Sequence, residues 1–369
     1  MKEKTKNVII LILFILIFSI VLILNICTKD IDISITERRK LKQFPKLTTK
    51  TVFNGKFSNE LETYFVDQFV GRDLFKNIKT SYSMNVMRKK DENKLFVRNG
   101  NIFKIEYPLN EKNIRSSTGK IKYVYEKYLH NKTNMNIYYS IIPDKTFYLE
   151  EDTLKMDYNE IESIINEELA NTNIQYIDIK DCLNLDSYYK TDIHWRQERL
   201  QKVVGRLQEK MLLESEDVKY EIKDVGKFYG VNYGQINSRD IIPDDMKIVT
   251  NDTINNAKTY NYETKTENKV YDNKKTKDKY DTYLSGPVSI IDIEKDNKRS
   301  GKELLLFRDS YGSSLAPLLL ENYDKITLID LRYVSKEILD KVISFDTKNI
   351  KTDVLFLYSG LVLNQNILK

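Results

Sequence analysis

Hydrophobic residues are distributed unevenly along the chain, and the longest apolar run lies near its start. Residues 8–26 read VIILILFILIFSIVLILNI and contain no charge, and about 20 such residues are needed to cross a bilayer as a helix. A cleaved signal peptide is the competing interpretation, but the run is longer than an ordinary signal core and no small-residue cleavage site follows it. A bulky residue precedes Cys27, which argues against a lipoprotein signal. We therefore expect an uncleaved transmembrane anchor, with residues 1–7 as a cytoplasmic tail.

The pattern changes directly after this anchor. Residues 27–51 are charged and contain one proline and no glycine, which is typical of a juxtamembrane linker. From residue 57 to residue 88 the apolar positions recur every three to five residues, which predicts an amphipathic helical region. We expect one large domain to occupy residues 52–369.

Segments with the pattern of strands and helices alternate in the first half of this domain. MNIYYSIIP (135–143) and IQYIDI (174–179) are β-rich apolar runs, and YNEIESIINEELA (158–170) between them has a helical period. Together they predict a β-α-β unit. Residues 196–213 predict a further helix, whereas the polar residues 250–282 predict a long surface excursion.

The C-terminal part repeats the alternation. Apolar runs at residues 303–307, 325–331 and 353–358 are separated by helical patterns at residues 311–323 and 335–345. Strands that are continuously apolar and joined by helices are typical of a sheet that is buried on both faces. The predicted fold class is therefore α/β, with a mostly parallel sheet and helices on both faces, preceded by one N-terminal transmembrane helix.

Composition and charge narrow the classes of function. A hydrophobic content of 41% with 31% charged residues indicates a globular protein, and a net charge of +5 is too small to argue for nucleic acid. Three lysines precede the anchor and five basic residues follow it within residues 29–42, so the positive-inside rule alone would place the domain in the cytoplasm. Cys27 and Cys182 are the only cysteines, and their positions exclude a disulfide within the domain.

Two short motifs carry candidate chemistry. Ser310, in LLLFRDSYGSS, comes directly after a buried strand and before a helix, where side chains gather beyond the carboxyl ends of parallel strands. Its own N–H lies at a helix start and is available to an oxyanion. In YKTDIHW, Asp192 and His194 are two residues apart, and in an extended segment they would project to the same side. The carboxylate can then hold one imidazole nitrogen while the other faces a substrate.

Each motif also has a structural interpretation. Ser310 would serve equally as a helix N-cap, and His194 as a half-buried histidine beside an aromatic residue. A zinc site is a poorer explanation, because no third group of ligands accompanies His194 and the neighbours of His130 are not metal ligands. The combination favours catalysis, because a serine nucleophile needs a base near neutral pH and the chain has only two histidines.

The sequence resembles the DHHW proteins, bacterial relatives of the alginate O-acetylation proteins, which have SGNH-hydrolase-like domains. The resemblance lies in YYKTDIHW and FRDSYGSSLAPLL, and also in YFVDQFVGRD, SIIPDK, FYGVNYG, DKYDTYLSGP and YDKITLIDLRYV, and it covers roughly residues 45–369. In ordinary SGNH hydrolases the serine comes early, whereas here Asp-x-His precedes the serine, which is the order of the alginate-type branch. The sequence departs from the family name at Ile193, where a second histidine is expected.

The resemblance implies a role for particular residues. It assigns Ser310 as nucleophile, with His194 and Asp192 completing a triad. It also implies Gly230 and Asn232, in FYGVNYG, as oxyanion donors, for which a turn role is the alternative. The candidate substrate-binding residues, in the sequences IHW, DSY and DLRYV, are Trp195, Tyr311 and Arg332, and for Arg332 a core ion pair is the alternative.

Two classes of function remain open at this stage. The first is a membrane-anchored O-acetyltransferase or esterase that acts on cell-surface or extracellular polysaccharide outside the cytoplasmic membrane, through an acyl-enzyme on Ser310. Such an enzyme needs no cofactor and no metal, and a membrane-bound acyl-transfer protein is a candidate partner. The second is a non-catalytic envelope protein that binds glycan or forms a scaffold, because a fold does not fix a function.

Overall fold

The computed structural model divides the chain into two compact units. It describes residues 3–34, 39–83, 87, 89, 91, 93–150, 153–214, 218–236, 241–271, 278–298, 300–345 and 350–369. One unit comprises residues 1–93 with residues 233–240, and the other comprises residues 94–232 with residues 241–369. Residues 52–93, which the sequence pattern grouped with the large domain, thus cluster with the N-terminal segment.

The first unit is built from helices. Its elements are α1 (Glu3–Cys27), β1 (Ile33–Ser34), β2 (Arg39–Lys40), α2 (Thr49–Phe53), α3 (Lys56–Gln68), α4 (Arg72–Ser81) and α8 (Tyr233–Ile236). α1 is long and apolar enough to cross a membrane, and none of its described residues is buried. Gly71 separates α3 from α4 with a φ of 78°, in the left-handed region that favours glycine.

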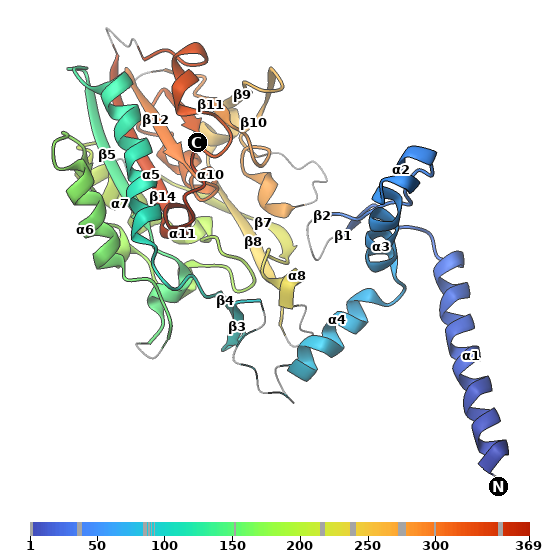
Figure 1. Ribbon diagram of the computed structural model, residues 1–369. Coiled ribbons are helices and arrows are strands. Elements are labelled where there is room, and N and C mark those ends of the chain that lie inside the picture. The colour runs from blue at the N-terminus through green and yellow to red at the C-terminus, as the bar shows by residue number, and fades with distance from the viewer. Residues whose placement is uncertain are drawn as a thin grey trace. The chain divides into compact units, whose positions relative to one another are not determined.

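The second unit is organised around one large sheet. Within its described residues, eight strands lie in the order β10-β9-β11-β13-β12-β14-β5-β6 (Figure 1). The strands are β5 (Met135–Ile142), β6 (Gln175–Tyr176), β9 (Lys258–Asn261), β10 (Thr266–Lys269), β11 (Ile290–Glu294), β12 (Lys302–Arg308), β13 (Lys325–Ile329) and β14 (Lys351–Ser359). The five strands from β13 to β6 pair in parallel, whereas β10, β9 and β11 pair antiparallel. The predicted α/β class is confirmed.

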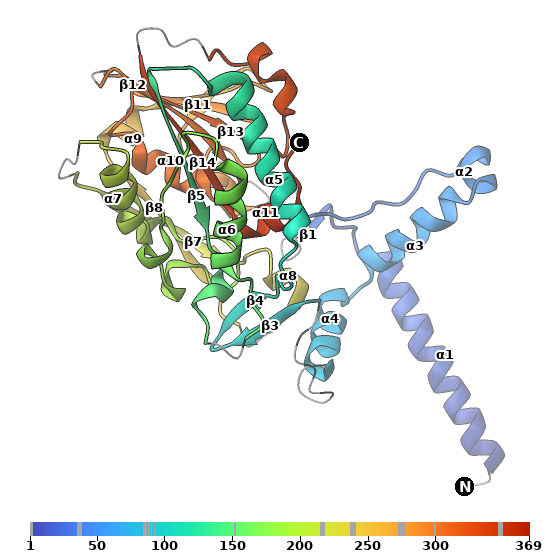
Figure 2. The same cartoon turned by 60° about the vertical axis from the view of Figure 1, so that its left-hand side comes forward.

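Helices cover both faces of this sheet, as the continuously apolar strands predict (Figure 2). Leu304 and Leu306 of β12 pack with α7 (Gln201–Lys210) and α10 (Gly312–Leu319). Leu305 and Phe307, which point to the other side, pack with the remaining helices. These are α5 (Glu111–Val124), α6 (Tyr158–Leu169) and α11 (Gly360–Gln365). The sheet therefore separates two hydrophobic cores.

The polar segment 250–282 differs from its prediction as a surface excursion. Its described residues contain α9 (Asp252–Asn256) and also β9 and β10, which extend the main sheet at one edge. β9 buries alternate residues only, so Thr259 and Asn261 face the protein while their neighbours stay exposed. A strand that is buried on one face only carries many polar residues, which is why the pattern of this segment resembled a loop.

Other elements also differ from the sequence pattern. Residues Lys336–Lys341 form 3₁₀ turns where a helix was expected. Two hairpins were not predicted: β3 (Leu95–Arg98) with β4 (Asn101–Lys104), and β7 (Glu221–Phe228) with β8 (Asp244–Thr250).

Candidate active site

Ser310 lies in a tight turn at the carboxyl end of a central strand. β12 ends at Arg308 and α10 begins at Gly312, so the turn has three residues. The carboxylate of Asp309, which is fully buried, accepts hydrogen bonds from Ser359 N at 2.8 Å and Ser359 Oγ at 2.7 Å. Its other oxygen accepts from Tyr311 N at 3.0 Å. Asp309 thus ties the serine turn to the end of the neighbouring strand, β14, while Ser310 itself stays half-exposed.

Asp192 and His194 are brought together by a turn, and not by the extended segment that the sequence suggested. Asp192 Oδ1 accepts from the backbone N–H of His194 at 3.0 Å, which is the side-chain-to-backbone bond of an Asx turn. The same oxygen lies 2.5 Å from His194 Nδ1. On either side of the turn, Tyr188 and Trp195 form an antiparallel bridge. The turn geometry itself therefore fixes the carboxylate against the imidazole.

The structure joins the three predicted catalytic residues. His194 Nε2 lies 2.7 Å from Ser310 Oγ, across 116 positions of sequence. Asp192 is fully buried and His194 is 8% exposed, so Ser310 is the member that solvent reaches most easily. A carboxylate on Nδ1 holds the imidazole in the form whose Nε2 can accept the serine proton. The arrangement is that of a nucleophile, a general base and the group that orients the base.

Gly230 packs against this turn, which differs from its predicted oxyanion role. A methyl group built on Gly230 would lie 2.4 Å from both Asp192 Cβ and Thr191 O. Its N–H donates to Thr191 Oγ1 at 2.8 Å, so an oxyanion would have to displace that bond. The next residue, Val231, donates its N–H to Asp192 Oδ2 at 2.7 Å. Gly230 therefore lets a backbone segment come close enough to bind the Asp192 carboxylate.

Asn232, the other predicted oxyanion donor, lines a cavity beside the Asp-x-His turn, and its oxyanion role stays a prediction. Its side chain is almost fully buried, and its Oδ1 has no hydrogen-bond partner among the described residues. It lines a small cavity of about 20 Å³ together with Ile193 and Tyr311, the neighbours of His194 and Ser310. The backbone N–H of Ser310 also donates to no acceptor in the part of the chain that the structure describes.

Lys145 binds the backbone of the Asp-x-His turn, and the sequence analysis did not identify it. Its Nζ donates to the carbonyls of Tyr189 at 2.8 Å, Lys190 at 3.0 Å and Asp192 at 3.1 Å. Burial lowers the pKa of Lys145 to about 8, and the nearby carboxylates oppose this shift. These are Asp244, Asp192 and Asp144. The sequence signal that could have identified Lys145 is SIIPDK, one of the stretches that carry the family resemblance.

Tyr280 is a second residue that sequence reasoning missed. Its ring stacks on the imidazole of His194, with centroids 4.1 Å apart and planes 18° from parallel. Its hydroxyl bonds to Ser314 Oγ at 3.1 Å, and burial raises its pKa far above the ordinary value. Tyr280 lies in DKYDTYLSGP, another of the family-like stretches. The stacking restricts rotation of the imidazole, which is what a base with one productive orientation needs.

The predicted substrate-binding residues have structural contacts. Trp195 is fully buried and its indole N–H donates to Tyr311 O at 3.1 Å and Ser314 Oγ at 2.9 Å. Tyr311 is also buried, and its hydroxyl donates to Ile193 O at 2.6 Å. Trp195 is enclosed by protein, whereas Tyr311 lines the small cavity beside Asn232. The substrate-binding role of both residues stays a prediction.

Arg332 forms the ion pair that was the alternative to substrate binding. Its guanidinium donates to both carboxylate oxygens of Asp330, with the shortest contact at 2.7 Å. Asp330 is fully buried and also contacts Arg308 at 3.3 Å. The hydrogen bonds to Asp330 keep the pKa of Arg332 above its ordinary value, even though burial opposes this.

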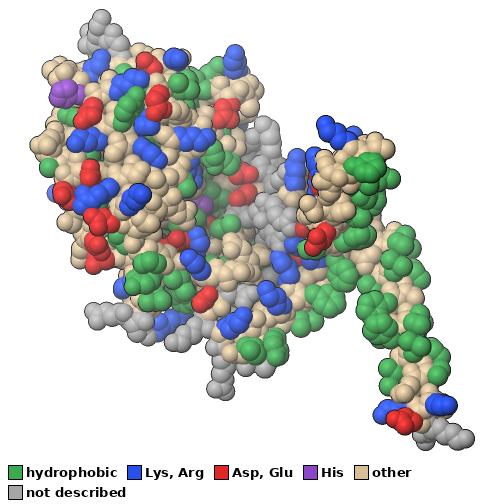
Figure 3. All heavy atoms as spheres, viewed as in Figure 1, with side chains coloured by type: hydrophobic (Ala, Val, Ile, Leu, Met, Phe, Trp, Pro, Cys, Tyr) green, Lys and Arg blue, Asp and Glu red, His purple; other side chains and the backbone are tan. Residues whose placement is uncertain are grey.

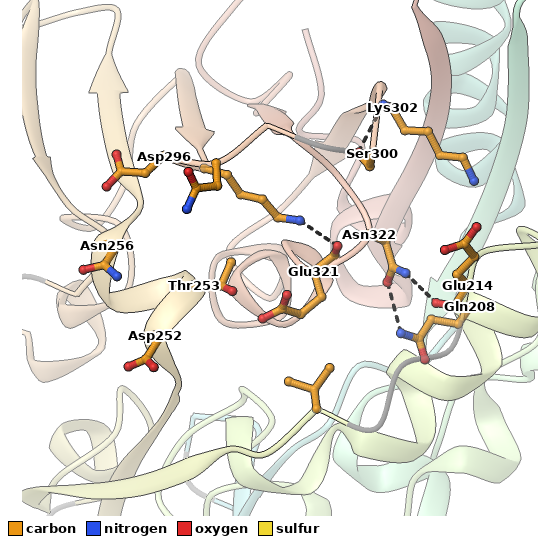
Figure 4. A pocket seen from close by; sticks show the side chains of 13 residues that line it. Gln208, Glu214, Asp252, Thr253, Asn256, Asp296, Ser300, Lys302, Glu321 and Asn322 are labelled. Carbon is orange, nitrogen blue, oxygen red and sulfur yellow. Dashed lines mark hydrogen bonds between the residues drawn. The ribbon is translucent and has the colours of Figure 1, made fainter.

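Another cavity in the described part of the protein lies away from these residues. It has a volume of about 520 Å³ and is lined by polar side chains, including Asp252, Glu321 and Lys302 (Figure 4). Lys302 begins β12, whereas Ser310 follows its end, and the seven residues of this strand span roughly 23 Å. The cavity thus lies far from the triad and contains none of the predicted site residues. Among the described residues, no group of three His, Cys, Asp or Glu side chains is placed to hold a metal ion.

Comparisons with known proteins find a likeness of structure. No model of a protein family matches the chain, and no curated protein sequence matches it significantly. A DHHW family protein from Eubacterium siraeum aligns with a TM-score of 0.60 and 18% identity, over 74% of this chain and 93% of its own. Bacillus cereus PatB1 with a sulfonyl adduct aligns with a TM-score of 0.57 and 18% identity, over 76% and 99% of the two chains. The O-acetyltransferase domain of Pseudomonas putida AlgJ aligns with a TM-score of 0.43 and 13% identity, over 73% and 92%. The resemblance to DHHW proteins is thus confirmed at the level of the fold.

Proposed function

We propose that this protein is a membrane-anchored serine O-acyltransferase or esterase that modifies extracellular polysaccharide. One observation carries the proposal: His194 Nε2 lies 2.7 Å from Ser310 Oγ, while its Nδ1 lies 2.5 Å from the carboxylate of Asp192. Structural histidines and N-cap serines do not require this chain of contacts. The three residues come from two segments that the fold has to bring together.

The contacts support a two-step acyl transfer as the proposed reaction. Ser310 Oγ attacks the acyl carbonyl of a donor ester, and its proton passes to His194 Nε2. The tetrahedral oxyanion is received by the N–H of Ser310 and by the Asn232 amide. His194 then gives the proton to the leaving alcohol, and an acyl-enzyme remains on Ser310. In the second step the oxygen of a sugar hydroxyl or of water attacks the acyl carbonyl and its proton passes to His194. The bond between Ser310 Oγ and the acyl group then breaks, and His194 returns the proton to Ser310 Oγ.

The neighbours in structure support the reaction class. The PatB1 structure carries a sulfonyl adduct, and sulfonyl reagents combine with activated nucleophilic side chains. The same kind of reagent is therefore a suitable probe for Ser310. We include an acetyl donor and a polysaccharide acceptor in the proposal because the sequence resembles O-acetylation proteins.

The proposed location is outside the cytoplasmic membrane. α1 is of a length and composition that can cross a bilayer, and an enzyme that modifies surface polysaccharide has to face its substrate. Protease added to intact protoplasts should degrade the second unit. Full protection of residues 94–369 would place the unit in the cytoplasm and contradict this part of the proposal.

A sulfonyl fluoride probe tests the catalytic proposal. We expect the purified full-length protein to be labelled at Ser310, with the site identified by peptide mapping. Ser310→Ala should abolish the label and His194→Ala should slow it strongly, because the hydroxyl loses its base. Absence of label on the wild-type protein with several probes and acyl donors would favour a non-catalytic envelope protein that binds glycan.

Kinetics on an acetylated model ester test whether the three residues act as one unit. Ser310→Ala and His194→Ala should each remove most of the activity, and the double variant should be little slower than either alone. Asp192→Asn should cost less than either, since nucleophile and base remain. It should also lower the melting temperature, because an amide group replaces a carboxylate oxygen that accepts a backbone N–H. Additive losses for Ser310 and His194 would refute the triad.

A further inference from the structure

The helices that follow α1 have their apolar side chains on the outside. In α4, Leu74, Phe75 and Ile78 are 45%, 57% and 54% exposed, whereas Thr80 is buried. α3 shows the same inversion, because Asp67 is its one buried residue. A helix at the surface of a soluble protein turns its apolar face inward. The exposed face therefore requires an apolar environment outside the unit.

These residues form one continuous surface, which we call the α3–α4 apolar face. It starts near the end of α3 and continues across the corner into α4. At the corner the rings of Phe69 and Phe75 pack together, with their centroids 5.6 Å apart. Its members are Phe65, Val66, Phe69, Leu74, Phe75 and Ile78, all exposed. Figure 3 shows hydrophobic side chains on the outward surface of these helices as well as along α1.

The corner between α3 and α4 is fastened to the end of α1. The backbone N–H of Val70 donates to Asn25 Oδ1 at 3.0 Å. Gln68 exchanges two hydrogen bonds with the backbone of Ile31, at 2.9 and 3.0 Å, and Tyr64 donates to Asp30 at 3.1 Å. Since α1 ends at Cys27, Asn25 lies about 3 Å from the helix end along its axis. The corner thus lies where the chain leaves the bilayer.

We propose that the α3–α4 apolar face is a second membrane contact, which lies in the surface of the bilayer that α1 crosses. The inference rests on α1 being a membrane anchor and is independent of the catalytic proposal. Aromatic residues beside basic ones are typical of a segment that lies in the interface. α4 carries Arg72, Lys76 and Lys79 against one acidic residue, Asp73, which suits anionic phospholipid headgroups.

The consequence is that the anchor does not act as a free tether. With α1 and α4 both in contact with the bilayer, the first unit is held in one orientation on the membrane surface. A second copy of the chain, or the chain's own second unit, would be the other possible cover for this face.

Quenching by brominated lipids separates these cases in the full-length protein. The chain has one tryptophan, Trp195, which is fully buried and provides the background emission. Phe75→Trp places a reporter on the apolar face, and Phe53→Trp is the matched control, because Phe53 is 90% exposed on α2. In Figures 1 and 2, α2 lies at the end of the unit opposite to the N-terminus of α1.

The protein is reconstituted in vesicles of phosphatidylcholine and phosphatidylglycerol, with and without bromine near the top of the acyl chains. We expect bromine to reduce the added emission of Phe75→Trp at least about twofold, as for a residue about 5–10 Å deep. Ile78→Trp, one turn further along the helix, should behave in the same way, and Phe53→Trp should be unaffected.

Two results would overturn the inference. If bromine quenches Phe75→Trp and Ile78→Trp no more than Phe53→Trp, the face is covered by protein, and a dependence of the emission on protein-to-lipid ratio would identify a second copy. If the wild-type protein fails to float with vesicles, α1 is no anchor and the inference fails with it. Labelling of Ser310 in the same preparations would show that the catalytic proposal stands separately.

Discussion

Gly230→Ala is expected to remove activity although it replaces none of the three proposed triad residues. The added methyl would lie 2.4 Å from Asp192 Cβ and from Thr191 O, and 2.5 Å from Asp192 Cα. Two of these three atoms belong to the backbone, so no side-chain rotation can relieve the contact. An ordinary contact needs about 1 Å more, and the segment that carries Asp192 and the segment that carries Gly230 have to separate by about that distance.

The size of the effect follows from the bonds that span this contact. Asp192 lies 2.5 Å from His194 Nδ1 and accepts from Val231 N at 2.7 Å, and a shift of about 1 Å breaks or lengthens both. Misplacement of a catalytic group by about 1 Å costs on the order of 10²-fold in rate. The crowding itself should cost about 1–3 kcal/mol of stability.

Gly205→Ala is the matched control. Gly205 lies in α7 of the same unit, and a methyl built there meets no atom within 4 Å. Alanine in a helix interior is favoured by about 0.5–1 kcal/mol, so this variant should be as active as the wild type and slightly more stable. The assays are the rate of sulfonyl labelling at Ser310, hydrolysis of a model acetyl ester and thermal unfolding. Full labelling and hydrolysis rates in Gly230→Ala would refute the close-packing role of this glycine.

Variants at three further residues test the surroundings of the triad and the Arg332 ion pair. Lys145 is charged below its pKa of about 8 and neutral above it. The rate of hydrolysis of the model ester should therefore fall on the alkaline side, with an apparent pKa of about 8. Lys145→Met should lose this pH dependence. In the unfolded chain Lys145 keeps its proton up to about pH 10.5, so its contribution to the free energy of unfolding increases as pH rises from 8 to 10.5. A melting temperature that falls in step with the rate would refute the assignment of the rate change to Lys145. Tyr280→Leu should lower the rate on the model ester while Tyr280→Phe retains most of it, since only the ring stacks on His194; equal losses would point to the hydroxyl. Arg332→Ala should cost about 1–3 kcal/mol of stability by leaving a buried carboxylate poorly paired and should leave KM for a small ester unchanged, whereas a raised KM without loss of stability would restore its role in binding substrate.

The central strands and the position of Ser310 were predictable because they depend on the pattern of residues that are close together in the sequence. ELLLF before Ser310 is continuously apolar and is followed by a helical pattern, so both the strand and the position of the serine beyond its end follow from the sequence. Asp192 and His194 were also found, although for an incorrect geometric reason. Their proximity depends on an Asx turn, and a two-residue spacing is compatible with either conformation.

The remaining features of the site depend on contacts between distant segments. The role of Gly230 is visible only when its neighbours in space are known, because a glycine in FYGVNYG equally fits an ordinary turn. Trp195 and Tyr311 lie next to catalytic residues in the sequence, yet their side chains point into the core. Tyr280 lies in a segment whose polar composition indicated a loop, and its stacking on His194 spans 86 positions. Adjacency in sequence was therefore a poor guide to adjacency at the site.

The position of β14 at the centre of the sheet has a consequence for how the protein is made. β14 pairs with β12 on one side and with β5 on the other, yet it is formed by residues 351–359, which follow all the other described strands of this sheet in the chain. Its last residue, Ser359, also holds the turn of the nucleophile through Asp309. Synthesis of the chain therefore reaches β14 only after every other described strand of this sheet, and neither the sheet nor the turn that carries Ser310 can be completed before residues 351–359 have been made. The earlier strands have to wait for their central partner, so the proposed nucleophile is held in place only after β14 has formed.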